Sequence, residues 1–177
     1  MVTVEAKRRR FRELHRDGCF VLPNPWDVGS LRRLEAAGFP AVATTSSGLA
    51  WSLGKADGEV GFDEVVAHLR ALVAATDLPV NADFEDGYAV DLAGLGRNVA
   101  AAVATGVAGL SIEDQRGDRL FDRVEAAERI AAARRAIDAI DPAVVLVGRA
   151  EGLLLGTAAL DDTIARLVAY AEAGADC

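Results

Sequence analysis

The chain has 177 residues, of which 51% are hydrophobic and 26% charged, so it can bury one sizeable core and is not a disordered protein. Its net charge of −8 argues against a nucleic-acid-binding protein, which would be basic. No apolar stretch is long enough for a membrane span, and the charged N-terminus does not resemble a signal peptide. We therefore expect one domain over residues 1–177, with no nucleic-acid or membrane partner.

The basic residues and the cysteines fit a cytoplasmic protein. The only basic run, Lys7-Arg8-Arg9-Arg10, is expected on the solvent-exposed face of an initial helix at Val4–Asp17. Cys19 and Cys177 are far apart and lack metal-ligand spacing, which fits a reducing compartment. Cys19 is expected to be a small core residue at the start of a strand.

Strand-like and helix-like segments alternate along the rest of the chain. The expected strands are nearly continuous apolar runs, as in a parallel sheet that is covered on both faces. They are Cys19–Asn24, Ala41–Thr45, Val80–Phe84, Gly109–Glu113 and Val144–Arg149. The expected helices are Val28–Ala37, Phe62–Ala75, Leu92–Ala104, Val124–Ile140 and Ala158–Ala173. This alternation indicates βαβ units and an α/β fold.

A repeat of glycines predicts the architecture. Gly38, Gly106 and Gly174 each follow a helix and precede a strand, at intervals of 68 residues (106 − 38 and 174 − 106). Two βα units in each interval indicate an eight-fold (β/α)8 TIM-type barrel, which needs roughly 250 residues. About five units are present, so we expect a C-terminally truncated barrel. The alternative is an open doubly wound sheet, which the lack of a Gly-rich phosphate loop after the first strand disfavours.

Acidic and amide side chains stand at the carboxyl ends of two neighbouring strands, where parallel α/β folds bind ligands. Asn81 and Asp83 are two residues apart and project to the same side, and Glu113 ends the next strand at the same height. Hard oxygen ligands of this kind suit Mg²⁺, with Mn²⁺ as a possible substitute, whereas the two histidines fall in helices and argue against zinc. The alternative is that Asp83 and Glu113 only pair with Arg149 or cap loops.

Arg149 ends an apolar strand, and a buried guanidinium requires an anion, which its fork can hold as a carboxylate. The backbone of Ser46, Ser47 and Gly48 could hold a carboxylate or phosphate, although an ordinary loop is the simpler interpretation. Trp26 is either a packing residue or a platform for the substrate.

Five motifs, taken in this order and spacing, resemble the isocitrate lyase/phosphoenolpyruvate mutase family from about Phe11 to the last residue. They are Asn24-Pro25-Trp26-Asp27, Leu53-Gly54-Lys55-Ala56-Asp57, Val80-Asn81-Ala82-Asp83, Ser111-Ile112-Glu113-Asp114-Gln115 and Gly148-Arg149-Ala150-Glu151. The resemblance implies a (β/α)8 barrel with Mg²⁺ at its mouth and chemistry next to a 2-oxo acid.

The resemblance also implies roles for individual residues. Asp83 would be a direct metal ligand, and Asp57 and Glu113 would act through metal-bound water. Arg149 would bind the carboxylate or oxyanion of the substrate, and the backbone of residues 46–48 would bind its other end. A divalent cation stabilises an enolate oxygen without proton transfer, which is the physical reason for this arrangement.

Two departures from the family pattern affect these expectations. Asn81 stands where the family's strand motif commonly has Asp, which lowers the negative charge of the site. The lyases carry a Lys-Lys/Arg-Cys-Gly-His gating motif after the fourth strand, whereas this chain reads Gln115-Arg116-Gly117-Asp118-Arg119-Leu120-Phe121-Asp122, without cysteine. Isocitrate cleavage itself is therefore not expected.

The main expectation is a Mg²⁺-dependent lyase-type enzyme that cleaves a C–C bond of a small 2-oxo or 2-hydroxy carboxylate through an enolate. The alternatives are a mutase or hydrolase acting on phosphonopyruvate or an oxo acid, and an inactive barrel fragment. A homo-oligomer is expected for the full-length form.

Overall fold

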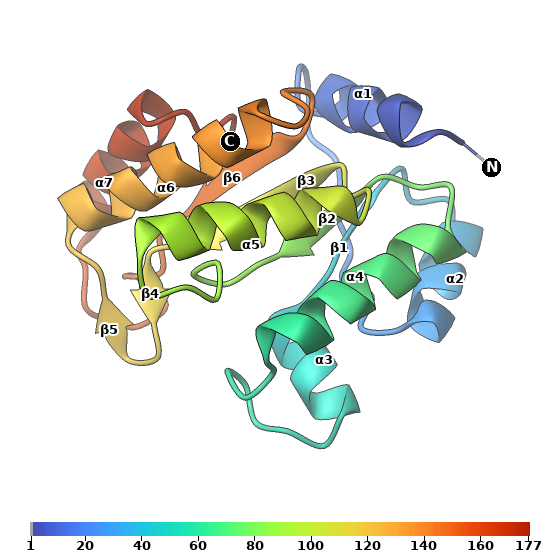
Figure 1. The fold of residues 1–177 in the computed structure, drawn as a ribbon, viewed down its shortest axis with the longest axis horizontal. Coiled ribbons are helices and arrows are strands. Elements are labelled where there is room, and N and C mark those ends of the chain that lie inside the picture. The colour runs from blue at the N-terminus through green and yellow to red at the C-terminus, as the bar shows by residue number, and fades with distance from the viewer. Residues whose placement is uncertain (1) are drawn as a thin grey trace.

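The computed structural model describes residues 2–177, which form a parallel sheet covered by helices on one face (Figure 1). The helices are α1 (Val4–Leu14), α2 (Val28–Ala36), α3 (Ser46–Ser52), α4 (Phe62–Ala75), α5 (Leu92–Ala104), α6 (Arg123–Asp138) and α7 (Leu160–Glu172). The strands are β1 (Val42–Ala43), β2 (Val80–Asp83), β3 (Gly109–Glu113), β4 (Gln115–Arg116), β5 (Arg119–Leu120) and β6 (Val145–Arg149).

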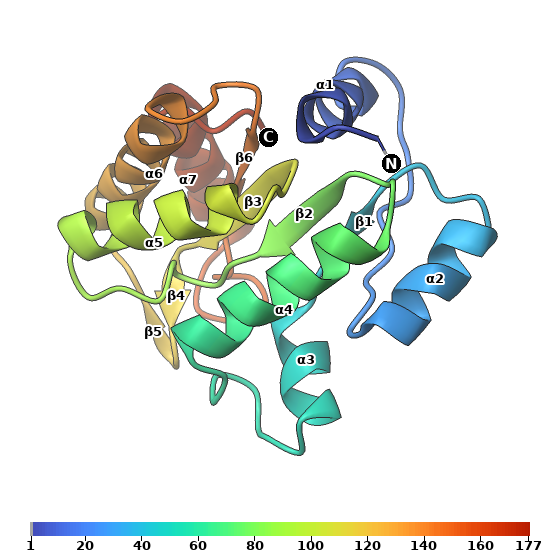
Figure 2. The ribbon, with the colours of Figure 1, turned by 45° about the vertical axis from the view of Figure 1, so that its right-hand side comes forward.

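The main sheet has the order β1-β2-β3-β6, and all its neighbouring strands are parallel. The strands follow one another in chain order, without the reversal that defines a doubly wound sheet. Helices α4, α5 and α6 cover the same face in succession (Figure 2). The predicted parallel α/β architecture is therefore confirmed, while closure of a barrel and its truncation remain predictions.

Four of the five expected strands form, and the first does not. Residues 19–24 run beside β1, where the Ala43 amide donates to the carbonyl of Pro23 at 3.0 Å. Pro23 and Pro25 have no N–H to donate to a ladder, which explains why the segment is extended but not a strand. Cys19 is exposed, so its assignment to the core was wrong.

The glycine repeat is confirmed. Gly38, Gly106 and Gly174 have φ values of +85°, +94° and +106°, the left-handed region in which a side chain is strained. Each ends a helix just before the chain turns toward the sheet. At Gly106 the fit is also tight, because a Cβ would lie 3.2 Å from the side chains of Val4 and Val73.

Helix α1 covers the amino ends of the strands. The ring of Phe11 is fully buried against Ala41, Ala108 and Val145, each of which lies one residue before a strand or at its start. Lys7 and Arg8 are also buried, so the expectation of a solvent-exposed basic face was wrong for these two. Their long side chains donate hydrogen bonds to backbone carbonyl groups near the C-termini of α4 and α5.

The larger core lies between the sheet and α4, α5 and α6. It leaves the carboxyl ends of the strands free for polar groups. None of the helices in residues 2–177 combines the length and apolarity that crossing a membrane requires.

Candidate active site

A cavity of about 1020 Å³ opens at the carboxyl ends of β2, β3 and β6. Its lining is strongly acidic, with seven side-chain carboxylates and two guanidinium groups. These are Asp57, Asp83, Glu85, Asp86, Glu113, Asp118 and Glu151, with Arg116 and Arg149. So much negative charge in one partly buried space favours a cationic ligand.

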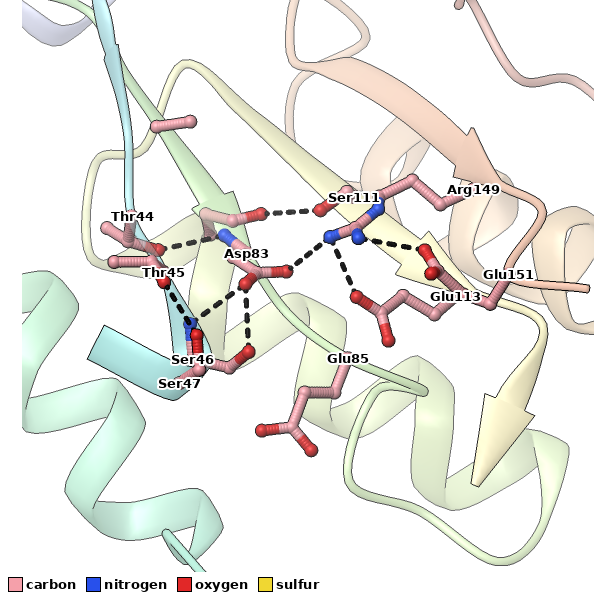
Figure 3. Close-up of polar contacts among 12 residues, drawn as sticks. Thr44, Thr45, Ser46, Ser47, Asp83, Glu85, Ser111, Glu113, Arg149 and Glu151 are labelled. Carbon is pink, nitrogen blue, oxygen red and sulfur yellow. Dashed lines mark hydrogen bonds and ion pairs between the residues drawn. The ribbon is translucent and has the colours of Figure 1, made fainter. Parts of the chain in front are cut away.

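Arg149 lines this cavity, and its guanidinium group lies among three carboxylates (Figure 3). Its Nη1 is 3.1 Å from Asp83 Oδ1 and 2.7 Å from Glu113 Oε1, and its Nη2 is 2.8 Å from Glu151 Oε1. The three carboxylates are nearly buried, whereas the arginine side chain is 40% exposed. Strands β2, β3 and β6 therefore bring the predicted residues Asp83, Glu113 and Arg149 together, because Asp83 and Glu113 end their strands and Arg149 pairs with Glu113 in the ladder.

Asp83 is held by the start of α3. The backbone amide of Ser46 and its hydroxyl donate to Asp83 Oδ2 at 2.8 and 2.9 Å, and the Asp83 amide donates to the Thr44 hydroxyl at 2.8 Å. The segment expected to be a loop is a helix because Thr45 caps it, accepting from the Gly48 amide. Two amides proposed for the substrate, those of Ser46 and Gly48, thus already have acceptors within the protein.

Trp26 lies outside the acidic cavity. Its side chain is about half exposed and borders a smaller cavity with Asp27 and Arg33. A Cβ on Gly48 would lie 3.1 Å from Trp26 Cβ, so the tryptophan packs against the start of α3. The structure therefore supports a packing contact, and the role as a platform for the substrate remains a prediction.

Asn81 and Asp83 share a side of β2 but lie at different depths. Asn81 Oδ1 is buried and has no hydrogen-bond partner among the described residues. A Cβ on Gly109 would lie 2.6 Å from this oxygen and 2.6 Å from the ring of Phe11, the residue of α1 that seals the other end of the sheet. Asn81 thus lines the cavity on the side nearer α1, and its role as a metal ligand remains a prediction.

Glu85, which the sequence analysis did not single out, lines the cavity beyond Asp83 (Figure 3). Its φ of +43° and that of Tyr88, +54°, are unusual for residues other than glycine and indicate a constrained loop. The Tyr88 hydroxyl donates to Glu85 Oε1 at 2.7 Å. The spacing of two residues between Asp83 and Glu85 is the only sign in the sequence that both side chains face the cavity. It is a weak sign, because β2 ends at Asp83.

The electrostatics of the cavity are those of an uncompensated acidic cluster. Burial raises the pKa of Glu113; with the opposing effect of Arg149 and the added effects of Asp83, Glu151 and Glu85, the pKa is about 8. Burial also raises the pKa of Glu85, helped by Asp83 and Asp57. Asp57 is thus close enough to Glu85 to affect its pKa, and its role beside a metal remains a prediction.

A divalent cation fits this donor set. Among residues 2–177, no three or more His, Cys, Asp or Glu side chains already stand in a metal-ligating arrangement. Mg²⁺ does not require one, since it keeps several waters and takes only one or two carboxylates directly. The surplus of seven carboxylates over two guanidinium groups in the lining is the feature that a cation would relieve.

The hairpin β4–β5 forms one wall of the cavity through Gln115, Arg116 and Asp118. Arg116 forms an ion pair with the buried Asp86, which anchors the hairpin to the loop after β2. The guanidinium groups of three arginines lie 4.8 to 5.7 Å from the centre of the Phe121 ring. This hairpin stands where the resemblance noted from the motifs places the gating motif of the lyases.

A charged cavity at the carboxyl ends of parallel strands defines the chain as an α/β protein with an enzyme-type site. The sequence profile of the phosphoenolpyruvate phosphomutase family matches residues 11–177. The chain belongs to this family, within the isocitrate lyase/phosphoenolpyruvate mutase superfamily, and the resemblance noted from the motifs is confirmed.

Three relatives illustrate the similarity. A Burkholderia cenocepacia structure, assigned provisionally as a lyase/mutase, is 44% identical with a TM-score of 0.92 over 96% of this chain and 63% of its own. An uncharacterized Mycobacterium tuberculosis protein is 36% identical over 94% of this chain and 62% of its own. The 2-methylisocitrate lyase of Escherichia coli is 32% identical over 80% of this chain and 50% of its own. The chain thus spans between half and two thirds of the length of these relatives.

Proposed function

We propose that this chain carries the active site of a Mg²⁺-dependent lyase-type enzyme that cleaves a C–C bond of a small 2-oxo or 2-hydroxy carboxylate through an enolate. The observation that carries the proposal is the placement of Arg149 among Asp83, Glu113 and Glu151 in an acidic cavity. The superfamily contains lyases and mutases, which supports an enzyme.

The acidic residues are proposed to hold the cation. Asp83 is the direct ligand in this proposal, and Asp57, Glu85 and Glu113 complete the negative field around it. When bound, the cation supplies the positive charge that polarises a 2-oxo group and stabilises an enolate oxygen. Ser46 fixes the Asp83 carboxylate from the side opposite Arg149, so that its orientation does not depend on the ligand.

Arg149 is proposed to bind the substrate carboxylate. It is the most exposed member of its cluster, and its planar fork suits a carboxylate better than a lysine would. Binding would replace part of its contact with Glu113 or Asp83 by a contact with the substrate. The carboxylates thereby released would be available to the cation, so the two ligands are expected to favour each other's binding.

The proton donor is not assigned. The hairpin between Gln115 and Asp122 contains no cysteine, unlike the gating motif of the lyases. Its anchored position beside Asp86 also differs from a long free loop. Isocitrate cleavage is therefore not part of the proposal.

A second candidate is cleavage of a P–C bond, or hydrolysis of an oxo acid, at the same site. The matched family takes its name from a phosphomutase, and the Burkholderia relative is assigned to lyases and mutases together. Both chemistries need a divalent cation and a carboxylate-binding arginine. Only turnover distinguishes them.

The test combines metal binding with product analysis. Titration calorimetry of the purified chain should show heat with MgCl₂ that the variant Asp83→Asn loses and that Asp63→Asn, an exposed acid on α4, retains. Proton and phosphorus NMR should then follow 2-methylisocitrate, oxaloacetate and phosphonopyruvate with Mg²⁺ and with EDTA. Mg²⁺-dependent formation of pyruvate from a carboxylate supports the proposal, and phosphate or phosphoenolpyruvate from phosphonopyruvate would replace it with the second candidate.

Absence of both magnesium heat and turnover would favour an inactive domain. Size-exclusion chromatography of the same samples tests the expected homo-oligomer. Location in the cytoplasm is also a proposal, which fractionation of cells expressing the protein would test.

A further inference from the structure

A second polar cluster lies directly behind the acidic cavity. Asp114 follows Glu113 at the end of β3, but it is 98% buried and does not line the cavity. Its carboxylate accepts hydrogen bonds from the Tyr170 hydroxyl at 2.5 Å, Arg166 Nη1 at 3.1 Å and the backbone amide of Glu151 at 2.8 Å. A buried carboxylate with three donors is fully satisfied and therefore rigid.

Asp114 holds the segment that carries Arg149. Its own amide donates to the carbonyl of Arg149 at 3.2 Å, while its side chain accepts from the amide of Glu151. These two hydrogen bonds hold the residues on either side of Ala150. They fix the backbone so that Arg149 and Glu151, two residues apart, both face the cavity and contact each other at 2.8 Å.

Tyr170 of α7 contacts the same segment from the other side. A Cβ on Gly148 would lie 3.0 Å from Tyr170 Cβ and 3.1 Å from its Cδ2, so the ring rests directly on the backbone one residue before Arg149. The side chain is 1% exposed. Tyr170 therefore touches the chain at Gly148 by packing and at Glu151 through Asp114.

We infer that Tyr170, acting through Asp114, is a positioning residue for Arg149: it sets where the guanidinium stands in the cavity and thereby tunes carboxylate binding. The inference rests on the proposed function in one respect, that Arg149 is the group that binds the carboxylate. Arg166 is the second donor of the cluster, and it also donates to the carbonyl of Phe121 at 2.9 Å, which ties the hairpin to the same point.

The variant Tyr170→Phe isolates the hydroxyl, because it keeps the ring on Gly148 and removes one hydrogen bond to Asp114. Asp162→Asn is the matched control, since Asp162 contacts the same Arg166 at 2.8 Å from the exposed side of α7. Nitrogen-15 NMR of the arginine side chains reports Arg149 directly. We expect its Nε–Hε resonance to shift or broaden in Y170F and to stay in place in D162N.

Ligand binding gives the second readout. Oxalate with Mg²⁺ serves as the probe, because it is a small planar dicarboxylate. We expect Y170F to weaken oxalate binding about fivefold and to change Mg²⁺ binding alone less than twofold, a split that a general loss of stability would not produce. In an Arg149→Met background, Tyr170→Phe should not weaken oxalate binding further, because the effects of substitutions at coupled residues are not additive.

The outcomes separate the two proposals. If wild-type protein binds no oxalate, the proposed function fails, and the arginine NMR still decides the positioning role. An unchanged Arg149 resonance in Y170F, or an equal loss of oxalate affinity in the Arg149→Met background, would overturn the inference. Should Y170F not fold, Arg166→Lys replaces it, because it retains the charge next to Asp114 but not the guanidinium fork, and the same shift of Arg149 is expected.

Discussion

The two ends of the sheet both hold buried charges, but they satisfy them differently. At the amino end, Arg8 donates to the carbonyls of Val107 and Val103 at 3.0 and 2.8 Å and pairs with Asp141 at 2.8 Å. Lys7 donates to the carbonyls of Val73 and Thr76, at the end of α4. Each cation there faces fixed acceptors, several of them at helix C-termini that favour positive charge.

At the carboxyl end the balance is reversed. One arginine, Arg149, is shared by three carboxylates, and further acids line the same cavity. The cations of the amino end leave no room for a ligand because their acceptors come from the protein itself. In the proposed function, a bound cation balances the surplus negative charge of the carboxyl end. The comparison indicates that charge balance, rather than burial, distinguishes the cluster at the amino end from the proposed binding site at the carboxyl end.

Replacing Arg149 gives the largest expected effect. Arg149→Met removes the cation from three carboxylates, so binding of oxalate in the presence of Mg²⁺ should weaken about 100-fold, as for truncation of one partner of a buried charge pair. Binding of Mg²⁺ alone should become tighter, because Asp83 and Glu113 lose their competitor. Calorimetry with each ligand measures both changes. Arg119→Met, on the exposed side of the hairpin, is the control, and unchanged oxalate binding in R149M would contradict the assignment of this end as the site.

Replacing Arg8 should affect stability without affecting ligands. Arg8→Met leaves Asp141 and the carbonyls of Val103 and Val107 without their donor, which is expected to cost about 3 kcal/mol of unfolding free energy. Urea unfolding measures the loss, and Arg9→Met, at the exposed neighbouring position, should change it by less than about 0.5 kcal/mol. If R8M instead weakened Mg²⁺ or oxalate binding in the folded protein, the two ends would not be independent.

The contrast also explains which features the sequence could predict. The strands at residues 109–113 and 145–149 are nearly continuous apolar runs, and the strand at 80–83 follows the same pattern of a helix and then a turn. Their ends carry Asp83, Glu113 and Arg149, so both the sheet and the convergence of these three residues followed from pattern. The glycines at 38, 106 and 174 likewise have a local cause, the left-handed turn after a helix.

Features that depend on distant partners were not predictable in this way. Lys7 and Arg8 are buried only because helix ends from residues 73–76 and 103–107 meet them, and nothing in the basic run shows this. Helix α3 depends on a single Thr45 cap. The depth of a side chain in the cavity was equally hidden: Asn81 and Glu85 both lie two residues from Asp83, and only tertiary packing separates them.

The different positions of Asn81 and Glu85 in the cavity predict different effects on Mg²⁺ binding, smaller than the effect expected for Arg149. Glu85→Gln should weaken Mg²⁺ binding about tenfold, because Glu85 lies in the electrostatic group of Asp57 and Asp83. Asn81→Ala should change it less than twofold, since the Asn81 oxygen lies beside Gly109 and Phe11. Magnesium calorimetry on the two variants compares them directly. The reverse order of effects would support the prediction from the sequence that Asn81 is one of the metal-site residues.

The smallest expected effect concerns a partly buried histidine that belongs to neither end. His68 lies on α4, and its Nε2 is buried without a hydrogen-bond partner among the described residues. Burial lowers the pKa of His68, with Asp27 opposing the shift. The folded-state pKa of His68 lies below the ordinary value of 6.5, so the unfolded chain binds the proton more readily than the folded protein does. The free energy of unfolding therefore decreases as the pH falls through 6.5.

His68→Gln should therefore flatten the acid side of the stability curve. One proton taken up on unfolding gives a slope of at most about 1.4 kcal/mol per pH unit, and the variant should lose part of that slope between pH 7 and 5. Urea unfolding at several pH values measures it, with Arg70→Gln on the exposed face of the same helix as the control. An equal slope in H68Q and wild type would show that His68 is protonated as easily in the folded protein as in the unfolded chain, in which case its burial has no electrostatic consequence.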